Sequence, residues 1–160
     1  MALPHPKQYL FKSGKVIVLS ILCVLIFQSC KHQRKIYQSN CNAGKSFKQV
    51  GFKQLMDSID HFDHQYIEVS GMYQEDKGIS ALVNDSLFTD HSSDNALWID
   101  FSQDCPLYLS GTRQGLFEYN DGEFTQINNK MITIRGLVTT GKGPHKHYKA
   151  AIERISFVKL

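Results

Sequence analysis

The chain has 160 residues, which is room for a single domain. Its residues are 42% hydrophobic and 21% charged, a composition typical of globular proteins that argues against a disordered chain. The formal net charge is +3, but basic and acidic side chains are segregated along the chain. Residues 31–53 hold six basic and no acidic side chains. Residues 54–128 hold two basic and 14 acidic side chains, and residues 129–160 hold seven basic and one acidic.

Residues 1–29 have the pattern of a signal peptide. Lys7, Lys12 and Lys15 occur without an acidic residue and are followed by an apolar run from Val16 to Phe27. This run is shorter than the roughly 20 apolar residues of a membrane-spanning helix. We therefore expect a cleaved signal rather than the alternative, an uncleaved membrane anchor.

The end of this segment, Phe27-Gln28-Ser29-Cys30, resembles a lipobox, the motif of bacterial lipoproteins, with Phe27 in place of the usual leucine. The resemblance implies cleavage after Ser29 and acylation of the Cys30 thiol, so that membrane lipid is the expected partner. Several acyl chains anchor a protein to a membrane without spanning it. Lys31 stands where an aspartate can retain lipoproteins in the inner membrane. The expected location is therefore the periplasmic face of the outer membrane.

Residues 30–45 are polar and lack an apolar period, which predicts a flexible, lipidated tether before a domain of residues 46–160. Cys41 and Cys105 remain once Cys30 is acylated and the signal is removed. In an oxidising compartment two such thiols often pair. A bond between them would stabilise the fold by roughly 4 kcal/mol on the chain-entropy model. The alternative is two unpaired thiols.

The next segment predicts one short amphipathic helix. Apolar residues recur at helical spacing from Phe47 to Phe62, and Ser46 is the candidate N-cap. We expect this helix to end near Asp60–Asp63.

The rest of the chain predicts strands. In residues 66–73 and 131–138, apolar and other residues alternate, and each segment contains the pattern apolar, x, apolar, x, Gly. The pattern predicts that Gly71 and Gly136 lie at bends where two long strands coil around a small closed barrel. Two shorter strands are expected at 79–83 and 96–101. Asp121-Gly122 predicts the turn of an inserted hairpin over residues 116–127. The last strand, 149–158, breaks period two between Ile152 and Ile155, which implies a bulge.

This order of elements resembles small bacterial OB-fold-like envelope proteins over about residues 50–160. The resemblance implies a mainly β fold: a five-stranded Greek-key barrel with one N-terminal amphipathic helix and an inserted hairpin. It also implies a ligand surface on the second and third strands and the adjoining loops. The segregated charges then have two interpretations. Acidic and basic strands attract each other weakly across the surface of one barrel, or the basic segments form a face that binds an anionic envelope polymer or lipid.

The loop over residues 140–149 is the first candidate site, with Lys142, His145, His147 and Tyr148 as its ligand-binding residues. Two imidazoles make half of a metal site, so the alternatives are a metal- or small-ligand-binding protein and a solvated basic loop. His61 and His64 form a second cluster near the predicted helix end. We assign no metal and no cofactor to either cluster.

No catalytic motif occurs in the sequence, and we expect a non-catalytic binding or accessory module of the cell envelope, whose partner is an envelope protein or an anionic polymer. Aromatic side chains offer a candidate stacking platform, namely Trp98, Tyr66, Tyr73, Tyr108, Tyr119 and Tyr148. The 14 carboxylates of residues 54–128 would repel a phosphate backbone, so we expect no nucleic acid partner.

Overall fold

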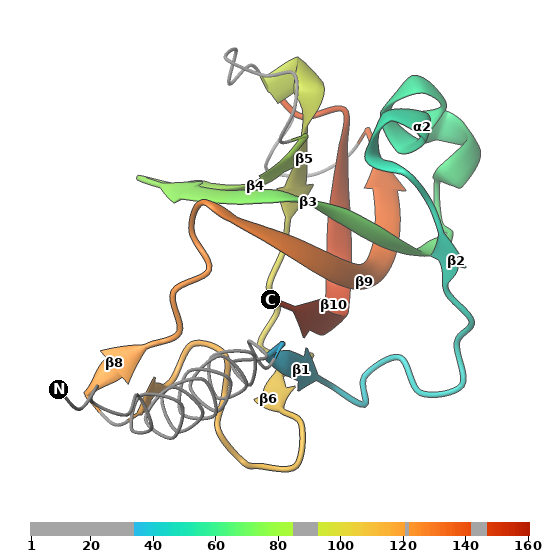
Figure 1. The fold of residues 1–160 in the computed structure, drawn as a ribbon. Coiled ribbons are helices and arrows are strands. Elements are labelled where there is room, and N and C mark those ends of the chain that lie inside the picture. The colour runs from blue at the N-terminus through green and yellow to red at the C-terminus, as the bar shows by residue number, and fades with distance from the viewer. Residues whose placement is uncertain (1–33, 85–92, 121, 142–146) are drawn as a thin grey trace, which may run out of the picture. The chain divides into compact units, whose positions relative to one another are not determined.

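The structure is a computed structural model that describes residues 34–84, 93–120, 122–141 and 147–160. It is mainly β (Figure 1). No helix within these ranges is long and apolar enough to cross a membrane. The strands are β1 (Ile36–Gln38), β2 (Lys48–Gln49), β3 (Tyr66–Asp76), β4 (Ile79–Val83), β5 (Ala96–Ile99), β6 (Tyr108–Leu109), β7 (Tyr119–Asn120), β8 (Glu123–Phe124), β9 (Lys130–Thr140) and β10 (Ala150–Lys159). The helical elements are α2 (Phe52–Asp57) and the 3-10 turns η1 (Ile59–Phe62) and η2 (Ser93–Asn95).

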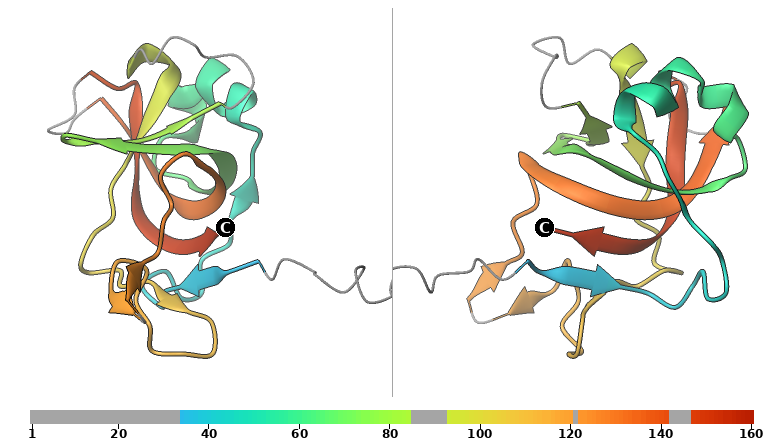
Figure 2. Two further views of the ribbon diagram at one scale, coloured as in Figure 1. Left: turned by 60° about the vertical axis from the view of Figure 1, so that its left-hand side comes forward. Right: turned by 45° about the vertical axis from the view of Figure 1, so that its right-hand side comes forward.

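Five strands close into a barrel. β3 pairs with β4 on one side and β9 on the other, β4 pairs with β5, and β10 joins β5 to β9. Only the pair of β5 and β10 is parallel within this ring. The ring therefore has the strand order of an OB-like Greek-key barrel, and the predicted fold class is confirmed (Figures 1 and 2).

The two glycine-containing strands face each other in a reciprocal register. Ile67 lies opposite Gly136, and Gly71 lies opposite Ile132. A Cβ atom at Gly71 would stand 2.7 Å from Leu82 Cγ, and one at Gly136 would stand 2.7 Å from the carbonyl oxygen of Glu153. Each glycine thus lets the next strand pass close by, which is how long strands coil around a barrel this small.

The helical region is shorter than predicted. Lys48–Gln49 forms β2, parallel to the start of β3, and the amide of Val50 donates to the carbonyl of Glu68. The expectation of a helix from Ser46 is therefore wrong at its start, because these backbone groups bond to the barrel. The N-cap of α2 is Gly51, with no side-chain cap. α2 and η1 together form the one amphipathic element before the barrel, with Phe52, Leu55 and Phe62 buried.

Part of the predicted tether is structured. β1 pairs with β10 and with β6, and Tyr37 is fully buried while its hydroxyl lies 2.9 Å from Thr125 Oγ1. Residues 36–38 therefore belong to the body rather than to a flexible tether. Three residues are too few to display an apolar period in the sequence, and only the pairing with β10 reveals the strand.

The two irregular features expected late in the chain are present. β10 has a bulge between Glu153 and Phe157, with Arg154 at φ 50. An insertion between β5 and β9, residues 100–129, carries the predicted hairpin as the short pair β7 and β8. We use "the insertion" for these residues below.

Candidate functional site

An aromatic pair lies on the outside of the barrel. Along β5, Leu97 and Ile99 are buried in the main core, while the alternating position holds Trp98, which points outward. Tyr148, just before β10, packs against Trp98 with ring centroids 5.5 Å apart and planes inclined at 58°. The barrel strand and the final loop thus meet at these two rings.

Apolar side chains pack next to this aromatic pair. Ala81 and Val83 of β4 and Ala96 of β5 form a second buried cluster, separate from the barrel core, against which Met72 and Tyr148 pack. Ala81 and Trp98 are direct partners in the register of β4 and β5. We call the six residues Met72, Ala81, Val83, Ala96, Trp98 and Tyr148 the β4–β5 face.

The β4–β5 face offers a ligand only its partly exposed side chains, Met72, Trp98 and Tyr148, because the other three are buried. These side chains provide ring surfaces and one polar group. Partial burial raises the pKa of the Tyr148 hydroxyl above its ordinary value of 10.0. Like any protonated tyrosine hydroxyl, it can donate a hydrogen bond. Such a surface suits a ligand with flat or ring-shaped groups, which stack on aromatic side chains.

The predicted aromatic platform is divided in the structure. Tyr66 packs against Phe47, Tyr73 lies inside the barrel against Phe101, and Tyr119 packs against Phe124 in the insertion. Of the tyrosines named from the sequence, Tyr148 is the one whose ring contact is with Trp98.

The loop residues of the sequence prediction are only partly described. Lys142 and His145 lie outside the described residues, and His147 is exposed. Lys149 is also exposed and lines a hollow of about 440 Å³ together with Met56, Ile59, Asp60 and His61. The fold therefore brings the helix end and the start of the last strand together, which no spacing in the sequence required.

The second histidine cluster lies where the end of η1 contacts the end of β9. The Asp63 carboxylate accepts a hydrogen bond from the amide of Thr140 at 2.9 Å, and this bond lowers the pKa of Asp63. His64 Nε2 lies 3.5 Å from Asp63 Oδ2. No three histidine, cysteine, aspartate or glutamate side chains come together as a metal site within the described part of the chain. The contacts seen here join the end of η1 to the end of β9.

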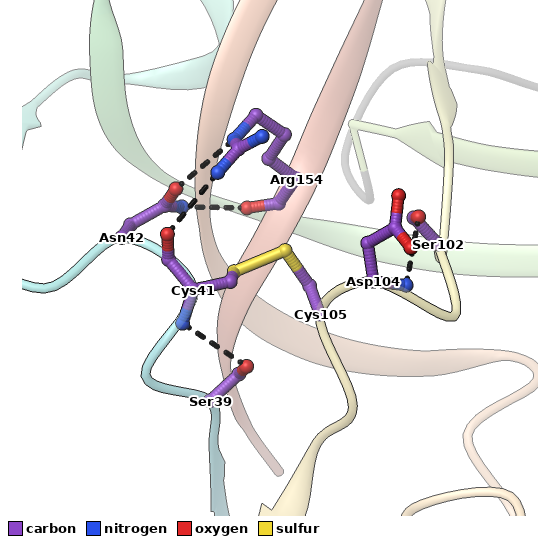
Figure 3. Close-up of a disulfide and its surroundings, with 7 residues drawn as sticks. All are labelled: Ser39, Cys41, Asn42, Ser102, Asp104, Cys105 and Arg154. Carbon is purple, nitrogen blue, oxygen red and sulfur yellow. Dashed lines mark hydrogen bonds between the residues drawn. A yellow bond between two sulfur atoms is a disulfide. The ribbon is translucent and has the colours of Figure 1, made fainter.

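A disulfide and the buried side-chain amide of Asn42 join the N-terminal segment to the rest of the fold (Figure 3). Cys41 and Cys105 are bonded, with Cα atoms 5.3 Å apart across a sequence separation of 64. The Asn42 side-chain amide donates to the carbonyl of Arg154 at 2.7 Å. The Arg154 guanidinium donates to the carbonyl of Cys41 at 3.1 Å and to Asn42 Oδ1 at 3.3 Å. Cys41, Asn42, Cys105 and Arg154 thus fix the N-terminal segment in place.

Sequence reasoning missed Asn42 and Arg154. The signal available was the broken period of the last strand, which marked the bulge but gave no partner for its free carbonyl. Cys30, the predicted lipid attachment site, lies outside the described residues. No protein-family model matches this chain, and no match is found among curated proteins or solved structures.

Proposed function

We propose that this protein is a lipid-anchored module of the bacterial envelope that binds an anionic envelope polymer without catalysing a reaction. The anchor is the acylated Cys30, at the periplasmic face of the outer membrane. The lipobox-like sequence before Cys30 supports the lipid attachment. The bond between Cys41 and Cys105 supports a site outside the cytoplasm, because disulfides persist in oxidising compartments.

The observation that carries the binding role is the pairing of Trp98 with Tyr148 on the outside of the barrel. In the sequence, Lys149 directly follows Tyr148, and Lys142 and Lys146 precede it. Ring-shaped sugar units of the polymer stack on the two aromatic side chains, and its anionic groups bind the lysines. The proposal thus joins the β4–β5 face and the loop in one surface.

The single tryptophan makes this proposal directly testable, because the intrinsic fluorescence of Trp98 reports on the β4–β5 face. Titration with soluble peptidoglycan fragments should shift and saturate this fluorescence, while neutral dextran should not. Added salt should weaken the binding. Tyr148→Ala and Lys149→Gln should each lower the affinity about tenfold, the effect of roughly 1.4 kcal/mol.

Matched controls lie elsewhere on the molecule. Tyr108→Ala removes an exposed tyrosine from the insertion, and Lys53→Gln removes an exposed lysine from α2. Both should bind as the wild type does. Unsaturable fluorescence, or equal losses in the test and control variants, would argue against a ligand surface on the β4–β5 face.

A further inference from the structure

The insertion exposes a group of large aromatic side chains. Four of the six large hydrophobic residues that are exposed in the described part of the chain belong to it. The exposed fractions are 42% for Tyr108, 51% for Phe117, 64% for Tyr119 and 57% for Phe124. Aromatic side chains gathered on a surface mark a contact with another molecule or with a membrane.

The insertion is bonded to the point where the described chain begins. β6 of the insertion pairs with β1, and the amide of Ser110 donates to the carbonyl of Ile36 at 2.8 Å. The Tyr37 hydroxyl lies 2.9 Å from Thr125 Oγ1, and the disulfide fixes Cys105 to Cys41. These contacts join the insertion, which carries the exposed aromatic side chains, to the start of the described chain.

The chain between the lipid and this unit is short. Cys30 precedes Arg34 by four residues, which span at most about 14 Å when fully extended. Figures 1 and 2 show β1, β6 and β8 together at one end of the barrel, with α2 at the other end. A bilayer that holds Cys30 is therefore within reach of the end of the barrel that carries the insertion.

We infer that the exposed aromatic side chains of the insertion insert into the headgroup region of the bilayer that holds Cys30, and so give the lipoprotein a second, non-covalent membrane contact. The inference rests on the lipid anchoring in the proposed function. Tyrosine is enriched at membrane–water interfaces, and surface-binding segments place Phe at the boundary with the acyl chains. The contact fixes which end of the barrel faces the membrane.

The charges of the insertion indicate which lipids it accepts. Residues 100–129 hold five acidic side chains and one basic side chain, and Glu118 and Glu123 flank the exposed aromatic residues. Anionic lipids attract basic segments and not acidic ones. The insertion itself therefore does not require anionic lipids, and its contact should form with zwitterionic lipids.

Fluorescence quenching by lipids tests this inference. The full chain, carrying Trp98→Phe so that no native tryptophan remains, is produced with its acyl groups and reconstituted in phosphatidylcholine vesicles. Phe124→Trp then places the sole tryptophan on the insertion, and Lys53→Trp places it on α2 as the matched control. Lipids brominated in the upper acyl chain should quench the emission of the Phe124→Trp protein by more than half and leave that of the Lys53→Trp protein unchanged.

The outcomes separate the two proposals. The intact mass of the same sample reports acylation, and a product without acyl groups overturns the anchoring and this inference with it. An acylated product with equal quenching in the two variants overturns the inference alone. Shielding of the Phe124→Trp side chain by concentration-dependent self-association, measured by ultracentrifugation without quenching by brominated lipid, would make the insertion a protein interface and also overturn it.

Discussion

The side-chain amide of Asn42 donates a hydrogen bond to the backbone carbonyl of Arg154 at 2.7 Å, across 112 positions of the chain. Arg154 adopts a positive φ of 50° within the bulge of β10, so its carbonyl leaves the strand ladder and turns toward the N-terminal segment. Asn42 is only 6% exposed. The amide thus satisfies a carbonyl that the bulge releases.

Asn42→Ala should destabilise the protein, because it leaves the Arg154 carbonyl without its partner. The expected loss is about 1–3 kcal/mol in the free energy of unfolding, measured by urea denaturation. Asn40→Ala, at an exposed neighbouring position, is the control and should change little. Equal stability of the two variants would mean that solvent replaces the amide.

The disulfide should contribute more than the amide. Cys41→Ser with Cys105→Ser should lower the free energy of unfolding by roughly 4 kcal/mol, because the unfolded chain regains the freedom of a long loop. Wild-type protein in excess reductant should unfold as this variant does, and the variant itself should not respond to reductant. A reductant-insensitive wild type would contradict the role assigned to the bond.

Gly71→Ala and Gly136→Ala should each cost about 1–3 kcal/mol by overpacking. At both positions a Cβ atom would stand less than 3 Å from a backbone oxygen of the adjacent strand, which cannot rotate away. Gly51→Ala is the matched control, since its φ is −69° and no atom lies within 4 Å of its added Cβ. In thermal unfolding monitored by circular dichroism, the Gly51→Ala control should have a melting temperature close to that of the wild type.

Cys30→Ala should abolish lipid attachment and leave an unprocessed precursor. In the proposed lipobox, the Cys30 thiol is the group that would accept the lipid. Mass spectrometry of the membrane fraction should find acyl groups on the wild-type N-terminal peptide and the full-length mass for the variant. Cys23→Ala, which changes a cysteine inside the apolar run, should be processed normally. A mature wild-type chain that begins elsewhere would refute the lipobox assignment.

Substitutions of the loop histidines and of the loop lysines should have different effects on polymer binding. His145→Ala with His147→Ala should leave both polymer binding and stability unchanged, since His147 is exposed and loop side chains contribute little to the core. Replacing Lys142, Lys146 and Lys149 by glutamine should lower the affinity for the anionic polymer and flatten its salt dependence. Micromolar zinc binding that the double histidine variant loses, seen by calorimetry, would favour the metal alternative instead.

Local patterns in the sequence predicted much of the barrel. The repeated spacing that ends in Gly71 and Gly136 indicated two long coiled strands, and Asp121-Gly122 indicated the hairpin of the insertion. The three-residue step from Ile152 to Ile155 indicated the bulge in β10. These signals are readable because period two and turn chemistry depend on neighbouring residues alone. The predicted helix start at Ser46 was wrong for the complementary reason. The backbone of β2 bonds to β3, which is adjacent in space but distant in the sequence, so no local pattern shows this pairing.

The sequence thus indicated the long barrel strands, their inward faces and their bends, while the lipid anchor stays a prediction. Only the fold shows which distant residues meet: Tyr37 with Thr125, Asn42 with Arg154, and Trp98 with Tyr148. The contact of Trp98 with Tyr148 depends on how the ring of strands closes through the parallel pairing of β5 with β10. Closure is a property of all five strands at once, and for that reason no local pattern contains it.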